Sequence, residues 1–168
     1  RKVALFEWDV PLGEKPATLR GWNGAANWLD DRNYPHHNFQ IRDTGMSAGS
    51  VVEQETTEGR AACDYLPIWV LSDGEQGAWF GPEWSGTWRF RAAGGEDAVH
   101  IGFELQYLDF VMKQGEEIQL PPFTMGAFEG DVWAGCLQMR RCIAEECAPG
   151  VDGEIEDPQV IYQVLGGP

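Results

Sequence analysis

The alternation of apolar and polar residues along this chain predicts short strands. The pattern is clearest over residues 98–105, where one face of the predicted strand is apolar and the other polar. The apolar positions are Val99, Ile101, Phe103 and Leu105. The strongest apolar run, residues 65–71, has the length and the Trp and Val content of a buried strand. Both segments predict a layered, sheet-based core.

Further strands are expected on either side of these two. Residues 77–84 and 87–92 are predicted to pair as a hairpin around a tight turn at Ser85-Gly86. Weaker extended segments are predicted over residues 3–10, 17–22, 38–43, 49–57, 107–112 and 116–128.

One short helix is predicted near the C-terminal end. Asp131 is a residue type that caps helix N-termini, and Arg140 and Arg141 stand where positive charge suits the C-terminal end of the helix dipole. The apolar residues between and beyond them recur at helical spacing: Val132, Trp133, Cys136, Met139 and Ile143. We therefore predict a mainly β protein, an antiparallel β-sandwich with one short C-terminal helix.

Composition narrows the set of partners. The 21 Gly and 10 Pro favour many turns over long helices. With 12 Lys+Arg against 27 Asp+Glu, the net charge of -15 leaves no basic patch for a phosphate backbone, so no nucleic acid and no membrane partner is expected. The four cysteines lack the spacing of a metal site, and neither a metal nor a cofactor is predicted.

Three ordered segments carry a family resemblance. They are Gly81–Phe90 (GPEWSGTWRF), Lys113–Pro122 (KQGEEIQLPP) and Gly130–Arg141 (GDVWAGCLQMRR). In this order they resemble the C-terminal half of the β-sandwich domain that precedes the catalytic barrel in α-galactosidase-like glycoside hydrolases, family 36 and its relatives. The likeness covers about residues 65–165 and is faint before them.

The resemblance implies a division of the chain and a role. Residues 1–129 would be the sandwich, with part of it preceding this chain. Residues 130–157 would be the helix and linker, and residues 158–168 the first strand of a (β/α)8 barrel. The implied role is non-catalytic support of that barrel, with an influence on substrate access or on homo-oligomer contacts. No catalytic residue carries over, because the family's two aspartates lie on later barrel strands. Bacterial cytoplasm and secretion both stay open.

A free-standing carbohydrate-binding module is the alternative. Tryptophan rings stack on the C–H faces of sugars, and nearby carboxylates accept hydroxyl protons. Two groups of candidate residues have this composition: Trp22 and Trp28 with Asp30, and Trp84 and Trp88 with Glu83. Burial in the core or against a neighbouring domain is the competing interpretation of the same tryptophans.

A remote third hypothesis is a serine hydrolase. Gly45–Gly49 matches the G-x-S-x-G pattern around Ser47, which requires a strand before the serine and a helix after it. The residues that follow, 50–57, have a strand-like pattern instead. We interpret the match as a glycine-rich turn.

Overall fold

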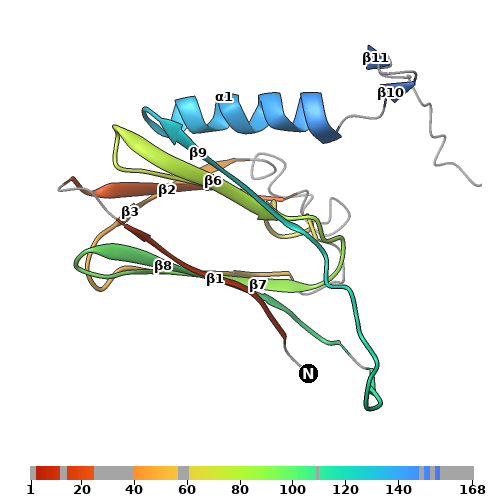
Figure 1. Cartoon of the computed structure of the whole chain (residues 1–168). Helices are drawn as coiled ribbons and strands as arrows, with labels where there is room; N and C mark the ends of the chain where they lie inside the picture. The colour runs from red at the N-terminus through yellow and green to blue at the C-terminus, as the bar shows by residue number, and fades with distance from the viewer. Residues whose placement is uncertain are drawn as a thin grey trace, which may run out of the picture.

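Two antiparallel sheets face each other in the computed structural model, which describes residues 3–11, 15–24, 40–56, 61–108, 110–147, 150–151 and 154–155 (Figure 1). The four-stranded sheet has the order β1-β8-β7-β4, and its strands are Val3–Pro11, Ala98–Leu105, Trp88–Gly94 and Val51–Glu55. The five-stranded sheet has the order β3-β2-β5-β6-β9, and its strands are Ile41–Met46, Ala17–Trp22, Trp69–Ser72, Gln76–Pro82 and Phe123–Glu129. The predicted β-sandwich is confirmed.

The core between the sheets is built on aromatic rings. Trp69 of β5 stacks on Phe90 of β7, with ring centroids 3.9 Å apart, and meets Trp88 edge-on at 5.4 Å. All three side chains have no exposed surface. Both indole N–H groups are satisfied, since Trp69 Nε1 donates to Gln54 Oε1 at 2.7 Å and Trp88 Nε1 to the Ala61 carbonyl at 2.8 Å. The rings thus join the two layers without leaving a buried polar atom unpaired.

The predicted alternation over residues 98–105 is confirmed by β8. Its four apolar side chains are buried, while the residues between them are only partly buried and face outward. Because side chains on a strand point alternately to its two faces, this pattern sets which face lines the core. β8 pairs with β1 on one side and β7 on the other.

The predicted hairpin over residues 77–92 is wrong. β6 belongs to the five-stranded sheet and pairs with β5 and β9, whereas β7 belongs to the four-stranded sheet and pairs with β4 and β8. The connection between them crosses from one layer to the other. Both edges of β6 are already occupied by other strands, so adjacency in sequence did not decide the pairing.

Three strand boundaries also differ from expectation. The buried strand begins at Trp69, not at residue 65, and Pro67 has no N–H to add to a ladder. Residues 107–108 and 110–112 form no strand, nor do residues 116–122, and β9 starts at Phe123 after two prolines. β9, which follows the two prolines, is an edge strand of its sheet.

Helix α1 covers Val132–Cys142 and continues as a π-helical turn over Ile143–Cys147. Asp131 is its N-cap, and the Oδ1 atom accepts from the backbone N–H groups of Trp133 and Ala134 at 3.0 and 3.1 Å. The predicted helix is confirmed. Within the predicted linker, β10 (Gly150–Val151) pairs with β11 (Glu154–Ile155). Residues 25–39 and the predicted first barrel strand, residues 158–168, lie outside the described residues.

Candidate functional site

Helix α1 lies across the outer face of the five-stranded sheet, on the side away from the four-stranded sheet (Figure 1). The contact is close because Gly135 has no side chain: a Cβ there would lie 2.5 Å from the ring of Phe128 and 2.6 Å from Val70 Cγ1. Trp79 Nε1 on β6 donates to Gln138 Oε1 of the helix at 3.0 Å. The helix is therefore held by both close packing and a directed hydrogen bond.

A buried arginine links the helix to the edge of the sheet. Arg20 on β2 is only 4% exposed, and its Nε and Nη2 atoms each donate to a different oxygen of Asp43 on β3, both at 2.7 Å. The guanidinium carbon lies 4.1 Å from the centroid of a Trp133 ring. A bidentate ion pair with a ring over it is a specific arrangement, because the planar fork fits both partners at once.

The electrostatics of this link follow from its geometry. The Arg20 guanidinium, through its hydrogen bonds to Asp43, holds the pKa of that carboxyl below its ordinary value. Burial raises the pKa of the nearby Cys136 thiol above its ordinary value, and Arg20 opposes part of that rise. Cys136 is consequently a protonated packing residue at neutral pH.

The opposite side of α1 presents apolar surface to solvent. Trp133 is 56% exposed and Leu137, one turn later, is 65% exposed. Arg140 continues the same line and is also exposed. We call these three residues the helix outer face. Large exposed apolar groups in contiguous positions are typical of surfaces that contact another protein or domain.

A small apolar cleft adjoins the C-terminal end of the helix. It has a volume of about 110 Å³ and lies between Met139, Cys142 and Ile143 and the strands β6 and β9. Glu83 and Thr124 stand at its rim, where the threonine hydroxyl donates to Glu83 Oε1 at 2.5 Å. The cleft contributes a second apolar feature on the helix side of the molecule.

Four of the six residues predicted as sugar-binding candidates belong to the part of the chain that the structure describes. Trp22 is half-buried beside the cluster of Val70, Trp79 and Phe128. Trp84 is half-buried against the core, and its Nε1 donates to the Thr87 carbonyl at 3.3 Å. Trp88 is fully buried and has no ring face open to a ligand. Glu83 is exposed, at the cleft described above. Trp28 and Asp30 lie outside the described residues.

Ser47 does not occupy a nucleophile elbow. It follows β3 and precedes β4, so a strand stands where the motif requires a helix. Its backbone N–H donates to Ser50 Oγ at 2.9 Å, and that hydroxyl donates back to the Ser47 carbonyl at 2.6 Å. The segment is a turn between two sheets, as the sequence suggested.

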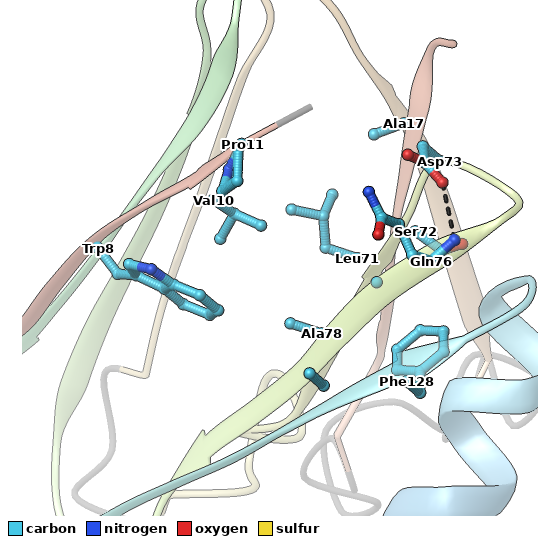
Figure 2. Close-up of a pocket in the computed structure, with 12 residues that line it drawn as sticks. Trp8, Val10, Pro11, Ala17, Leu71, Ser72, Asp73, Gln76, Ala78 and Phe128 are labelled. Atoms are coloured by element: carbon cyan, nitrogen blue, oxygen red, sulfur yellow. Dashed lines mark hydrogen bonds between the residues drawn. The ribbon is translucent and has the colours of Figure 1, made fainter. Parts of the chain in front are cut away.

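A further hollow, of about 200 Å³, opens at one end of the sandwich. Figure 2 shows Val10, Leu71 and Ala78 lining it from both sheets, with Asp73 and Gln76 at the rim. Asp73 Oδ1 already accepts from the backbone N–H groups of residues 75 and 76, at 2.9 Å each. The lining of this hollow is mainly apolar, and no set of reactive side chains converges on it.

Two classes of site are not found among the residues that the structure describes. No group of three or more His, Cys, Asp or Glu side chains is placed to hold a metal ion. In the same part of the chain, no helix is both long and apolar enough to cross a bilayer.

Comparison with known proteins finds a similarity of fold but no similarity of sequence to a known family. No protein-family model matches the sequence, and no curated protein does. The fold is similar to that of the GH36 alpha-galactosidase AgaA from Geobacillus stearothermophilus, with a TM-score of 0.65 over 90% of this chain and 14% sequence identity. This chain covers 21% of that protein. At this identity the likeness shows a shared fold.

Sequence reasoning missed the exposure of the helix outer face. The helical spacing of Trp133 predicted its place on the helix, but it did not predict that the ring would lie over Arg20 with more than half of its surface open. The available signal was Leu137, which stands one turn from Trp133 and outside the apolar positions expected to pack on the sheet.

Proposed function

We propose that this chain is the non-catalytic β-sandwich of a carbohydrate-active enzyme similar to the α-galactosidases of family 36, where it supports a catalytic barrel. The observation that carries the proposal is the fold likeness, which spans 90% of this chain but only 21% of the α-galactosidase. The three ordered segments at 81–90, 113–122 and 130–141 support the same assignment independently, since they were identified from sequence alone.

The helix outer face is the surface by which the sandwich would contact that barrel. Trp133 and Leu137 expose more than half of their surface and do not belong to the aromatic core between the sheets. The exposed apolar surface of these two side chains is therefore available to a partner. The partner proposed is the barrel domain of the same parent chain, which the resemblance places directly after the helix and linker.

The coding sequence on the far side of Pro168 tests this proposal. We expect about 250 further residues in which strands and helices alternate, as a barrel of this type requires. We also expect aspartates at the ends of two later strands, one for the nucleophile and one for the acid/base. A reading frame that stops near Pro168 would overturn the accessory role.

A measurement of hydrolysis separates the two parts. The complete gene product is expected to hydrolyse a nitrophenyl α-galactoside, and the chain 1–168 is expected to be inactive. Activity that stays with the chain 1–168 would contradict the proposal, since it would place the catalytic groups in the sandwich.

A further inference from the structure

The outer face of the four-stranded sheet carries charged side chains in register. Glu7 on β1 is opposite Gly102 on β8, Gly102 is opposite Arg91 on β7, and Arg91 is opposite Glu53 on β4. These residues point outward, because β8 alternates and the neighbours of Gly102 along the strand, Ile101 and Phe103, are buried. One row across the four strands therefore consists of an acidic residue on β1, a glycine on β8, a basic residue on β7 and an acidic residue on β4.

The glycine opens a hollow in this row. A Cβ at Gly102 would have the Arg91 carbonyl oxygen, at 3.9 Å, as its nearest neighbour, so the space above the backbone is empty. The hollow has a volume of about 350 Å³. The side chains around it are Glu7, Glu53, Arg89, Arg91, His100 and Glu104. Glycine in a strand interior weakens the strand and often marks a bulge, a tight bend or a site where a ligand or another backbone approaches closely. The register is regular across Gly102, so no bulge accounts for it.

The walls of the hollow are held in place by ion pairs. Glu53 bridges two arginines, with Oε2 3.2 Å from Arg89 Nη2 and Oε1 3.3 Å from Arg91 Nε. Each guanidinium has five N–H donors, so these contacts leave donors to spare, and the Arg91 and Glu53 side chains are 47% exposed. At the far end, His100 Nδ1 and Asp9 Oδ1 are 2.8 Å apart. These contacts gather hydrogen-bond donors and acceptors around the hollow.

The mixture of charges selects the class of ligand. Carboxylates at Glu7, Glu53 and Glu104 oppose a phosphate or another anion, and the two guanidinium groups oppose a metal cation. A neutral ligand with many hydroxyls fits both, since carboxylates accept hydroxyl protons while guanidinium groups donate to hydroxyl oxygens.

A second hollow lengthens the site. It has a volume of about 300 Å³, shares Glu53 and Arg89 with the first, and reaches Tyr65 beyond the edge of β4. Two hollows bordered by the same ion pair suit a ligand with more than one unit rather than a single small molecule. The half-buried Tyr65 supplies an aromatic group at that end.

We propose that the hollow over Gly102, with its extension toward Tyr65, binds a neutral oligosaccharide through hydrogen bonds to Glu7, Glu53 and Arg91. This site lies on the sheet opposite the helix outer face, and it does not depend on the presence of a catalytic barrel. Because no tryptophan lines the hollow over Gly102 for a sugar ring to stack on, weak binding is expected.

The test replaces the glycine. Gly102→Val fills the floor of the hollow with a residue that strands favour, so the variant is expected to fold at least as stably as the wild type. Its matched control is Gly45→Val on β3, where a Cβ would meet nothing within 4 Å and which does not line the hollow. Amide chemical shifts are followed while raffinose, maltotriose, cellotriose and xylotriose are titrated in turn, with inorganic phosphate as the anion control.

We expect at least one trisaccharide to shift the amides of residues 7, 91 and 102 in a saturable way. Gly102→Val should weaken that binding about tenfold or more, equivalent to 1.4 kcal/mol, and Gly45→Val should leave it unchanged. Glu7→Gln, which keeps the shape but removes the charge, should weaken it to a lesser degree.

Three results would overturn the proposal. The first is the absence of saturable shifts at this face with all four sugars. The second is sugar binding that persists undiminished in Gly102→Val. The third is a response to phosphate alone, which would indicate an anion site at the arginines. None of these results bears on the helix outer face or on the coding sequence, so failure here and failure of the proposed function are distinguishable.

Discussion

The interior of the sandwich and the interface under helix α1 use the same five-stranded sheet in different ways. Between the sheets, Trp69, Phe80 and Phe90 are fully buried and stack on one another. Under the helix, a smaller apolar cluster of Val70, Trp79 and Phe128 packs against helix side chains, and two directed contacts accompany it: the hydrogen bond from Trp79 to the helix and the helix tryptophan ring over Arg20. Apolar stacking gives stability, while directed polar contacts fix how the helix is placed. The difference indicates that the core provides most of the stability of the fold, whereas the helix carries the exposed apolar surface of the helix outer face.

The largest effect is expected in the core. Trp69→Ala removes a ring with no exposed surface that stacks on Phe90 and leaves Gln54 without the indole donor. We expect a loss of about 4 kcal/mol in the free energy of unfolding, from cavity formation together with the unpaired amide. Urea unfolding followed by circular dichroism measures it. A loss below 1 kcal/mol would contradict the central place given to this ring.

Asp43→Asn is expected to lower the free energy of unfolding by a smaller amount, about 2 kcal/mol. Arg20 is almost fully buried, and the substitution leaves its charge without a carboxylate partner. The cost is moderated because the Asp43 side chain is 43% exposed and solvent screens the pair. The matched control is Asp9→Asn, which removes an exposed carboxylate on the other sheet. Equal stability losses in the two variants would show that burial of Arg20 has no effect.

The ion pair between Arg20 and Asp43 predicts that the stability of the fold depends on pH. The folded-state pKa of Asp43 lies below its ordinary value of 3.8, so its contribution is present above that value and is lost as the pH falls through the lowered pKa. The stability difference between wild type and Asp43→Asn should therefore be constant near neutral pH and shrink under acid conditions. Thermal unfolding at a series of pH values measures it, and a difference that grows on acidification would refute the assignment.

Gly135→Ala should destabilise by about 1 kcal/mol. Alanine is the better helix former by about that amount, but a methyl group at this position meets the Phe128 ring and Val70, and overpacking of this kind costs more. Chemical denaturation measures whether the substitution lowers or raises the free energy of unfolding. Arg140→Ala, at an exposed position of the same helix, is the control and is expected to change stability little. A more stable Gly135→Ala variant would mean that the helix sits farther from the sheet.

The smallest effect on stability belongs to the helix outer face. Leu137→Ser changes a side chain that is 65% exposed, so the free energy of unfolding of the chain should move by less than about 0.5 kcal/mol. In the complete gene product, the same change should lower the melting temperature, because it removes an apolar contact with the proposed partner domain. Val111→Ser, at an 86% exposed position, is the control and should change neither protein.

The sequence predicted the parts of the fold that depend on local pattern. The alternation of β8 and the helix cap at Asp131 could be predicted because each depends only on residues that are neighbours in sequence. The placement of β6 and β7 in different sheets could not be predicted, since the sheet that a strand joins depends on which strands, here β5 and β9 or β4 and β8, occupy its two edges. The same limit hid the hollow over Gly102. The glycine was visible at an outward position of the strand, but its row of charged neighbours comes from strands far apart in sequence.

The most direct test of the central claim is oxidative footprinting of Trp133 and Leu137 by hydroxyl radicals. The reaction rate of each side chain is compared between the chain 1–168 and the complete gene product, with Val111 as an internal reference. The account predicts that both helix residues are strongly protected in the complete protein while Val111 reacts equally in the two. Equal reactivity of Trp133 and Leu137 in both proteins would contradict the claim that this face is where the sandwich meets its catalytic partner.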